Sequence, residues 1–159
     1  MNRAPGLLMV CMGNICRSPM AEGALRQRLA AAGLAQALRV DSAGTSRAHA
    51  GEPPDPRAVA CAARHGVDIA AQRARGLEPE DYDRFDYLLC ADRSVLHDAG
   101  VRKPRTAHAQ VVLLLDWTGQ GRRDVPDPYY GGSRDFEHVW RLVDAAAAEI
   151  VARVQAGAL

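Results

Sequence analysis

Leu7-Leu8-Met9-Val10-Cys11-Met12-Gly13-Asn14-Ile15-Cys16-Arg17-Ser18-Pro19-Met20 is the stretch that decides the fold. The apolar run up to Val10 has the length and composition of a strand. It ends at Cys11, before a glycine and an asparagine that tolerate unusual backbone angles. Ser18 can cap a helix through its hydroxyl, and Pro19 suits the first helical position. The sequence therefore predicts a strand, a tight turn after Cys11 and a helix that begins at Ser18.

This turn has the features of an anion site. The peptide N–H groups of residues 12 to 17 can surround a tetrahedral guest, and the helix N-terminus adds partial positive charge. Arg17 adds a planar fork of donors that can grip two oxyanion oxygens together. The same field favours the thiolate form of Cys11. The stretch therefore predicts a site where a thiolate attacks a phosphoryl group.

Other interpretations of the turn compete with this one. A Walker-type nucleotide loop ends in Gly-Lys-Ser/Thr, which is absent here. Cys11 and Cys16 form a Cys-x4-Cys pair, but no second Cys or His pair at ligand spacing completes a zinc site, so no metal is predicted. A plain structural turn is the remaining alternative.

Length, charge and cysteine usage place the chain in a broad class. Its 159 residues suit a single domain, 1–159, and 20 basic against 19 acidic residues leave a net charge of +1. We therefore expect no nucleic-acid partner and no membrane insertion. The N-terminal segment resembles neither a signal peptide nor a spanning helix. The four cysteines lack the spacing of a disulfide framework, which favours a cytoplasmic location.

Predicted strands and helices alternate along the rest of the chain. After a helix closed by Gly33, strands are expected at 38–42, 87–90 and 111–115. Helices are expected from Asp55-Pro56 to near His65, from Asp92 to about Ala99, and along 133–154, with at most a short one near Pro79. This order predicts an α/β fold, a four-stranded parallel sheet with helices on both faces in the flavodoxin-like, doubly wound manner. Ligands of such sheets bind at the carboxyl ends of the strands, where Cys11 lies.

The string from Cys11 to Glu22, with Arg17 and Ser18 at its centre, resembles the phosphate loop of the low-molecular-weight protein tyrosine phosphatases. The segment Val125-Pro126-Asp127-Pro128-Tyr129-Tyr130-Gly131 is similar to the family's general-acid segment, and the resemblance covers about residues 6 to 154. It implies the phosphotyrosine phosphatase I type of fold. It also implies metal-independent hydrolysis of phosphotyrosine in proteins and of small aryl phosphates, with no cofactor, by a monomer or weak oligomer.

The resemblance also assigns catalytic roles. Cys11 would attack phosphorus and form a cysteinyl-phosphate, and Asp127 would protonate the leaving oxygen and later activate water. Arg17 would hold the phosphate together with the loop residues Met12, Gly13, Asn14, Ile15, Cys16 and Ser18. From the residues alone, Asp127-Pro128 is ordinary turn chemistry, and only the resemblance favours an acid.

Supporting roles follow from the same resemblance. Asn14 would hold the loop in a strained shape with help from Ser42, and His65 would buttress that network. The alternatives are that Asn14 and Ser42 are ordinary turn residues and that His65 is a satisfied residue at a helix end. Cys16 would form a reversible disulfide with Cys11 under peroxide, or is simply a small buried residue.

The predicted substrate cleft consists of His49, Tyr129 and Tyr130. The tyrosines would flank the substrate ring, or would merely anchor their loop or be phosphorylated themselves. The family commonly has a tryptophan where Ala48 stands, so the aromatic preference of this cleft is a separate question from its chemistry.

Three other functions compete with this one. Thioredoxin-coupled arsenate reductases share the loop but use a further cysteine pair, whereas Cys61 and Cys90 are far apart in the sequence. Protein arginine phosphatases differ by a threonine at the position of Ile15 and lack the paired tyrosines. A phosphate-binding module without catalysis would normally have lost Cys11, Arg17 or Asp127.

Overall fold

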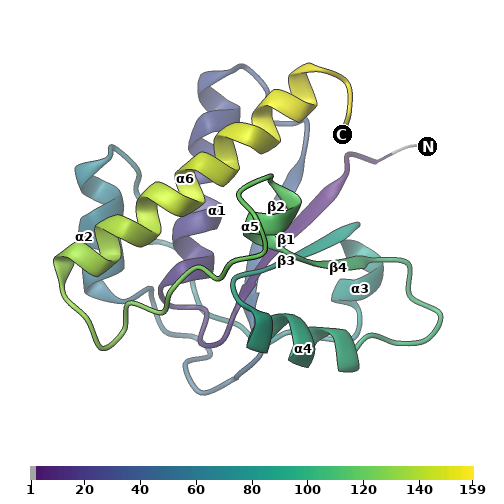
Figure 1. The fold of residues 1–159 in the computed structure, drawn as a ribbon, viewed down its shortest axis with the longest axis horizontal. Coiled ribbons are helices and arrows are strands. Elements are labelled where there is room, and N and C mark those ends of the chain that lie inside the picture. The colour runs from purple at the N-terminus through teal and green to yellow at the C-terminus, as the bar shows by residue number, and fades with distance from the viewer. Residues whose placement is uncertain (1–2) are drawn as a thin grey trace.

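The computed structural model describes residues 3–159, which form one domain around a four-stranded parallel sheet (Figure 1). The strand order is β2-β1-β3-β4, and every neighbouring pair is parallel, which confirms the predicted fold class. The strands are β1 (Gly6–Cys11), β2 (Arg39–Gly44), β3 (Tyr87–Cys90) and β4 (Gln110–Leu113).

Helices cover both faces of this sheet. The strand β1 is therefore buried on both sides, and its side chains point alternately into the two cores. Leu7, Met9 and Cys11 join a core formed with α1 (Arg17–Ala31), α2 (Pro56–Arg64), α5 (Leu114–Trp117) and α6 (Ser133–Gln155). Leu8 and Val10 face the opposite core, beside α3 (Asp81–Arg84) and α4 (Arg93–Val101). Figure 1 shows α1, α2 and α6 together on one side and α3 and α4 on the other.

Several predicted boundaries are wrong. The strand expected at 38–42 runs from Arg39 to Gly44. The first helix begins at Arg17, and Ser18 provides no capping bond because its hydroxyl contacts Asn14 and Cys11 instead. The fourth strand ends at Leu113, and the next two residues belong to α5, where they are still buried. A short apolar run suits a strand and a buried helical turn equally well, so periodicity could not separate the two.

The other predicted helices are confirmed. Asp55 caps α2 by accepting from the Arg57 N–H, and Asp92 caps α4 by accepting from the Val95 N–H. The apolar stripe of α6 lies in the core, and Trp140 on it is buried as predicted.

The sheet places Cys11 at a topological switch point. Cys11 pairs with Gly44 of β2 and Val10 pairs with Cys90 of β3, so β1 lies between β2 and β3, and the chain passes from one side of β1 to the other between these two strands. In doubly wound sheets this is where the loops diverge and a ligand crevice opens. The fold therefore puts the loop after Cys11 in the position expected of a binding site.

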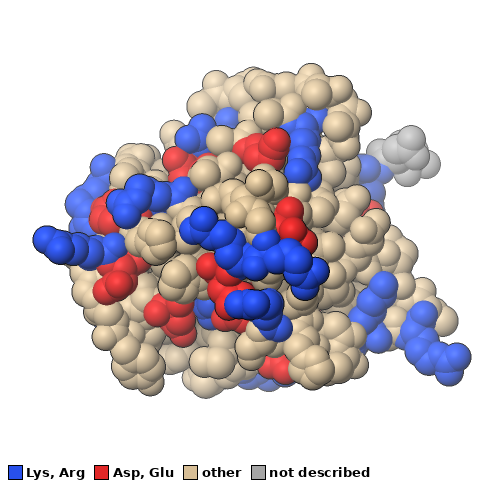
Figure 2. Space-filling model, viewed as in Figure 1, with Lys and Arg blue, Asp and Glu red and all other residues tan. Residues whose placement is uncertain are grey.

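The surface carries charges of both signs. In Figure 2 basic and acidic side chains lie next to one another over the face shown. Within residues 3–159, every helix is too short or too polar to cross a membrane.

Candidate active site

The loop from Cys11 to Arg17 directs its carbonyl groups away from its own interior. The carbonyls of Cys11 and Met12 accept from the N–H groups of Thr45 and Ser46, and the Ile15 carbonyl accepts from Asp55. The N–H and C=O of a trans peptide point in opposite directions. The following N–H groups, of Met12, Gly13 and Cys16, therefore face the inside of the loop, which is the arrangement that binds an anion.

Asn14 holds this loop through three hydrogen bonds. It has φ of 57°, and it alone among the non-glycine residues of 3–159 has a positive φ. Its Nδ2 donates to Ser18 Oγ at 2.8 Å and to Ser42 Oγ at 3.0 Å, and its Oδ1 accepts from the Arg75 N–H at 3.0 Å. The side chain is 2% exposed, so these bonds form away from water. They offset the cost of the left-handed conformation.

The same bonds orient the Ser18 hydroxyl toward the thiol. Ser18 Oγ lies 3.0 Å from Cys11 Sγ. Because Ser18 Oγ already accepts from an amide that can only donate, its own hydrogen is free to point at the sulfur. The geometry thus supplies Cys11 with a hydrogen-bond donor, as a thiolate requires.

Two members of this network were missed by the sequence reasoning. Glu22 Oε1 accepts from Ser42 Oγ at 2.7 Å, and the Glu22 side chain is almost fully buried. Arg75 contributes its backbone N–H, while its guanidinium pairs with Asp41 and Asp81. The structure buries Glu22 beside Arg17 and Ser18 in the first turns of α1, and the apolar spacing of this helix did not mark it.

Arg17 is buried and fixed by Asp92. Its Nη1 donates to Asp92 Oδ2 at 2.6 Å and to the Val125 carbonyl at 3.0 Å. Burial lowers the pKa of Arg17, but the charge of Cys11 and the bond to Asp92 outweigh it, so the pKa lies above its usual value. Asp92 was predicted only as a helix cap. It serves both purposes, because its other oxygen caps α4.

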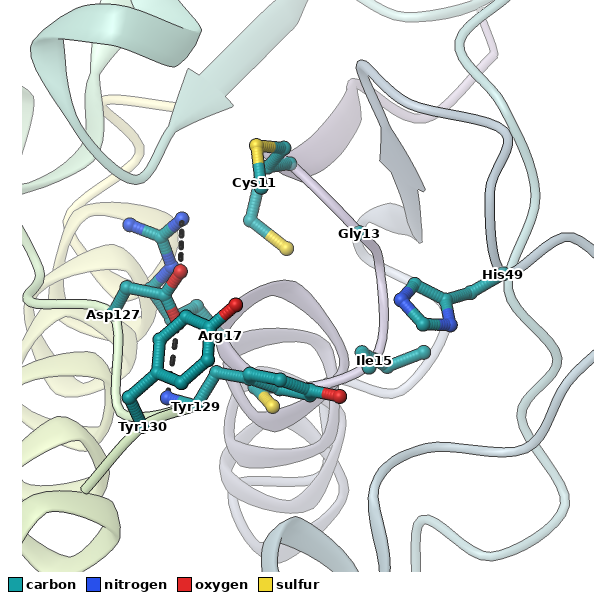
Figure 3. A pocket seen from close by; sticks show the side chains of 10 residues that line it. Cys11, Gly13, Ile15, Arg17, His49, Asp127, Tyr129 and Tyr130 are labelled. Atoms are coloured by element: carbon teal, nitrogen blue, oxygen red, sulfur yellow. Dashed lines mark hydrogen bonds and ion pairs between the residues drawn. The ribbon is translucent and has the colours of Figure 1, made fainter.

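Asp127 lies at the open side of the pocket. Its Oδ2 is 4.0 Å from Arg17 Nη2, its side chain is 44% exposed, and its Oδ1 accepts from the Tyr129 N–H at 3.1 Å. Figure 3 shows Asp127 and both tyrosines on one side of the pocket, with Cys11 and His49 facing them. The tyrosine rings meet edge to face at 5.0 Å.

A cavity of about 220 Å³ joins most of the predicted site residues. Its lining is Cys11, Met12, Gly13, Ile15, Cys16, Arg17, His49, Asp127, Tyr129 and Tyr130. Tyr130 is 95% exposed, so it forms the rim rather than the floor. Ala48 is exposed and lies outside this lining, which leaves His49 as the wall opposite the tyrosines.

Arg57 ties the tyrosine segment to α2. Its guanidinium pairs with Asp55, donates to the Tyr129 and Gly131 carbonyls, and lies over the Phe136 ring at 4.8 Å. The neighbouring Asp55 N–H holds the Ile15 carbonyl of the anion loop. The start of α2 therefore connects the two halves of the pocket.

The supporting role predicted for His65 is wrong. His65 Nε2 lies 2.8 Å from Glu137 Oε2, and its ring stacks on Trp140 with centroids 5.1 Å apart. It makes no hydrogen bond to Asn14 or Ser42. Its backbone N–H donates to the Ala62 carbonyl at the end of α2, which agrees with the alternative of a satisfied helix-end residue. The His65-Gly66 pair predicted the end of the helix correctly, but it carried no information on the direction of the His65 side chain.

Comparison with known proteins identifies the family. A family model described as low molecular weight phosphotyrosine protein phosphatase matches residues 6–158. The human low molecular weight phosphotyrosine protein phosphatase is 41% identical over 137 residues, which are 85% of this chain and 86% of that protein. A putative low molecular weight protein-tyrosine-phosphatase of Synechocystis is 40% identical over 147 residues, 91% of this chain and 93% of that protein.

A solved structure agrees with the sequence relatives. The crystal structure of a protein tyrosine phosphatase from Entamoeba histolytica, with Hepes in its active site, has a TM-score of 0.90 and 30% identity. The match covers 98% of this chain and all of that one. This chain belongs to the low molecular weight phosphotyrosine protein phosphatase family, which is a family of hydrolases.

Proposed function

We propose that this protein hydrolyses phosphotyrosine in proteins, and small aryl phosphates, with Cys11 as nucleophile and Asp127 as general acid. The observation that carries the proposal is the shared pocket. One cavity brings the thiol of Cys11, the guanidinium of Arg17 and the carboxyl group of Asp127 together with two tyrosine rings. An anion site beside aromatic walls suits a phosphate group on a phenol.

In the first step, the Cys11 thiolate attacks phosphorus in line with the departing oxygen. A sulfur–phosphorus bond forms, the phosphorus–oxygen bond breaks, and the protonated Asp127 gives its proton to the phenolate oxygen. Arg17 and the inward N–H groups of the loop hold the three equatorial oxygens. Asp92 and the Val125 carbonyl keep the guanidinium in place.

In the second step, water attacks the cysteinyl-phosphate. Asp127, now a carboxylate, takes a proton from that water, and the sulfur–phosphorus bond breaks to release inorganic phosphate. The Ser18 hydroxyl, 3.0 Å from the sulfur, stabilises the departing thiolate. Ser18 therefore acts on the second step more than on the first.

The test is to compare three substrates side by side, with a chelator present: a phosphotyrosine peptide, a phosphoarginine peptide, and arsenate with thioredoxin. Preference for phosphotyrosine supports the proposal. Faster turnover of phosphoarginine, or arsenate reduction, would mean that the anion loop serves a different substrate. Inactivity toward all three, in a preparation whose thiols are reduced, would favour a binding module.

The state and position of the cysteines support proposals on regulation and location. Cys11 and Cys16 are both free and both line the cavity, which supports a reversible disulfide between them under peroxide. The four free cysteines favour a reducing compartment, so we place the protein in the cytoplasm. We propose that it acts as a monomer or weak oligomer on phosphoprotein partners.

A further inference from the structure

Three potential metal ligands meet where α2 packs on α6, away from the residues that line the active-site cavity. Cys61 and His65 are four residues apart, at the end of α2, and therefore lie on one side of that helix. Glu137 faces them from the first turns of α6. Its Oε1 is 3.5 Å from Cys61 Sγ, and its Oε2 is 2.8 Å from His65 Nε2.

These spacings fit a single small cation. One ligand atom from each of the three residues lies within 4.8 Å of the other two. In a tetrahedral zinc site, with bonds of about 2.0 to 2.3 Å, ligand atoms are roughly 3.3 to 3.6 Å apart. Shifts of a few tenths of an ångström to about one ångström bring the three atoms to that spacing, and the side chains of His65 and Glu137 are 37% and 27% exposed, which leaves them room to move.

The His65 ring is already oriented for binding. It stacks on Trp140 with an interplanar angle of 13°, which holds Nε2 toward Glu137 and limits rotation of the ring. Pre-orientation of this kind reduces the entropy lost when a ligand is fixed. The thiol of Cys61 is fixed as well, because its side chain is fully buried in the core between the two helices.

We propose that Cys61, His65 and Glu137 bind one divalent cation of the zinc type, with water from the solvent side as the fourth ligand. A thiolate, an imidazole and a carboxylate form the donor set that zinc prefers. On binding, the Cys61 thiol transfers its proton to the buffer and the sulfur bonds to the ion. One thiolate and one carboxylate then balance the two positive charges.

The site has a built-in competitor. Arg64 Nε donates to Glu137 Oε1 at 3.0 Å, and this guanidinium must leave when the ion binds. Burial, followed by the charge of Glu137, raises the pKa of the Cys61 thiol to about 11, so proton release adds a second cost. Arg64 is 49% exposed, so its side chain can move into water.

Binding would join α2 to α6 and stabilise the folded chain. No residue of α2 or α6 is among those that line the active-site cavity, and this includes Cys61, His65 and Glu137. The inference therefore does not depend on the proposed reaction, and its readouts are spectroscopic.

The experiment is a titration with Co²⁺ of a chain in which Cys11→Ser and Cys16→Ser remove the two thiols of the active-site cavity. A thiolate bound to Co²⁺ gives charge-transfer absorption in the near ultraviolet, and Zn²⁺ should abolish it by displacement. In the same background with Trp117→Phe, Trp140 is the remaining tryptophan. Its fluorescence should be quenched with the same midpoint, because His65 stacks on it.

Four further variants, each made in that background, decide the assignment. Glu137→Gln and His65→Gln should weaken Co²⁺ binding by at least about tenfold, because each removes a ligand. Arg64→Ala should strengthen it severalfold by removing the competitor. His108→Gln is the matched control, since His108 also lies beside carboxylates but has no thiol partner.

Each outcome bears on the proposal. Saturable absorption at one equivalent, with affinity weakened in Glu137→Gln and strengthened in Arg64→Ala, supports the site. Absence of the charge-transfer band in a folded chain would overturn it, as would binding that is unaffected by Glu137→Gln and His65→Gln. Folding of each variant is checked by its circular dichroism, so a collapsed core is not mistaken for a lost ligand.

Discussion

Asn14 shows how one residue combines strain and support. Its left-handed backbone turns the loop so that successive N–H groups face inward, and its amide holds three partners that are distant in the sequence. Glycine would adopt the same backbone more easily but could not make these bonds. The strained backbone of Asn14 costs conformational energy, but its side chain orients the Ser18 hydroxyl, which is the hydrogen-bond donor to Cys11.

Replacing Asn14 separates these two contributions. We expect Asn14→Ala to lower the free energy of unfolding by about 3 kcal/mol, from three lost hydrogen bonds at about 1 kcal/mol each. Asn14→Gly loses the same bonds but avoids about 1 kcal/mol of left-handed strain, so its loss should be about 2 kcal/mol. Urea denaturation measures both values. Equal losses would mean that the positive φ carries no cost here.

The Cys16 thiol should resist alkylation even at alkaline pH. Burial, followed by the charge of Asp55, raises the pKa of the Cys16 thiol to about 12. Below that pH the thiol keeps its proton, and a protonated thiol is a poor nucleophile. We therefore expect iodoacetamide to modify Cys11 and spare Cys16 from about pH 6 to about pH 9.

Peptide mapping by mass spectrometry reads out that prediction. Cys16→Ser should be alkylated at Cys11 as fast as the parent chain, and Cys11→Ser should resist alkylation at Cys16. Rapid labelling of Cys16 in the Cys11→Ser chain would contradict the assignment of the two thiols.

At the scale of elements, the N-terminal end of α2 joins the two halves of the pocket. Asp55 caps the helix, binds the Ile15 carbonyl through its N–H, and pairs with Arg57. Arg57 in turn holds the segment of Tyr129 and Gly131 and packs over the rings of Tyr129 and Phe136. This single turn therefore sets the position of the acid segment relative to the anion loop.

Arg57→Ala should loosen the acid segment without removing a group that touches the substrate. Small displacements of reacting groups lower rates steeply, and we expect kcat/KM for an aryl phosphate to fall by roughly tenfold. Arg57→Lys should recover only part of the rate, because an ammonium cannot make the same fork of bonds.

Arg73→Ala is the matched control for this variant. Arg73 is exposed and donates only to carbonyls of its own segment, Ala70 and Gln72. We expect its kinetics to match the parent chain. If Arg57→Ala and Arg73→Ala were equally active, the acid segment would not depend on the contact with α2.

At the scale of the whole molecule, the pocket combines loops from distant parts of the chain. The anion loop joins β1 to α1, whereas Asp127 comes from the segment that precedes α6. The anion loop was predictable because its strand, turn and helix signals are adjacent in the sequence. Asp127 was predictable only through the family resemblance, since Asp-Pro has the same appearance in any turn.

What sequence reasoning missed depends on contacts between elements. Glu22 binds Ser42 between α1 and β2, and Asp92 holds Arg17 beyond the carboxyl ends of the two central strands, β3 and β1. Neither contact leaves a periodic signal in the sequence. The error at His65 has the same origin, because its ring follows Trp140 and Glu137 of α6 rather than the network near the loop.

The assembled pocket predicts a dependence on the leaving group. Asp127→Ala removes the proton donor, so release of phenol should slow far more than release of nitrophenol, which departs readily without a proton. The ratio of kcat/KM values for the two aryl phosphates measures this effect. Equal slowing of both substrates would remove Asp127 from the role of acid.

The most direct test of the account is to isolate the phosphorylated enzyme. Asp127→Ala also lacks the base for the second step, so with nitrophenyl phosphate the cysteinyl-phosphate should accumulate. Rapid quenching followed by mass spectrometry of the peptide that contains Cys11 measures it. We expect the added mass of one phosphoryl group on Cys11, absent in a chain that also carries Cys11→Ser. Turnover by the Cys11→Ser chain, or a phosphoryl group on any other residue, would contradict it.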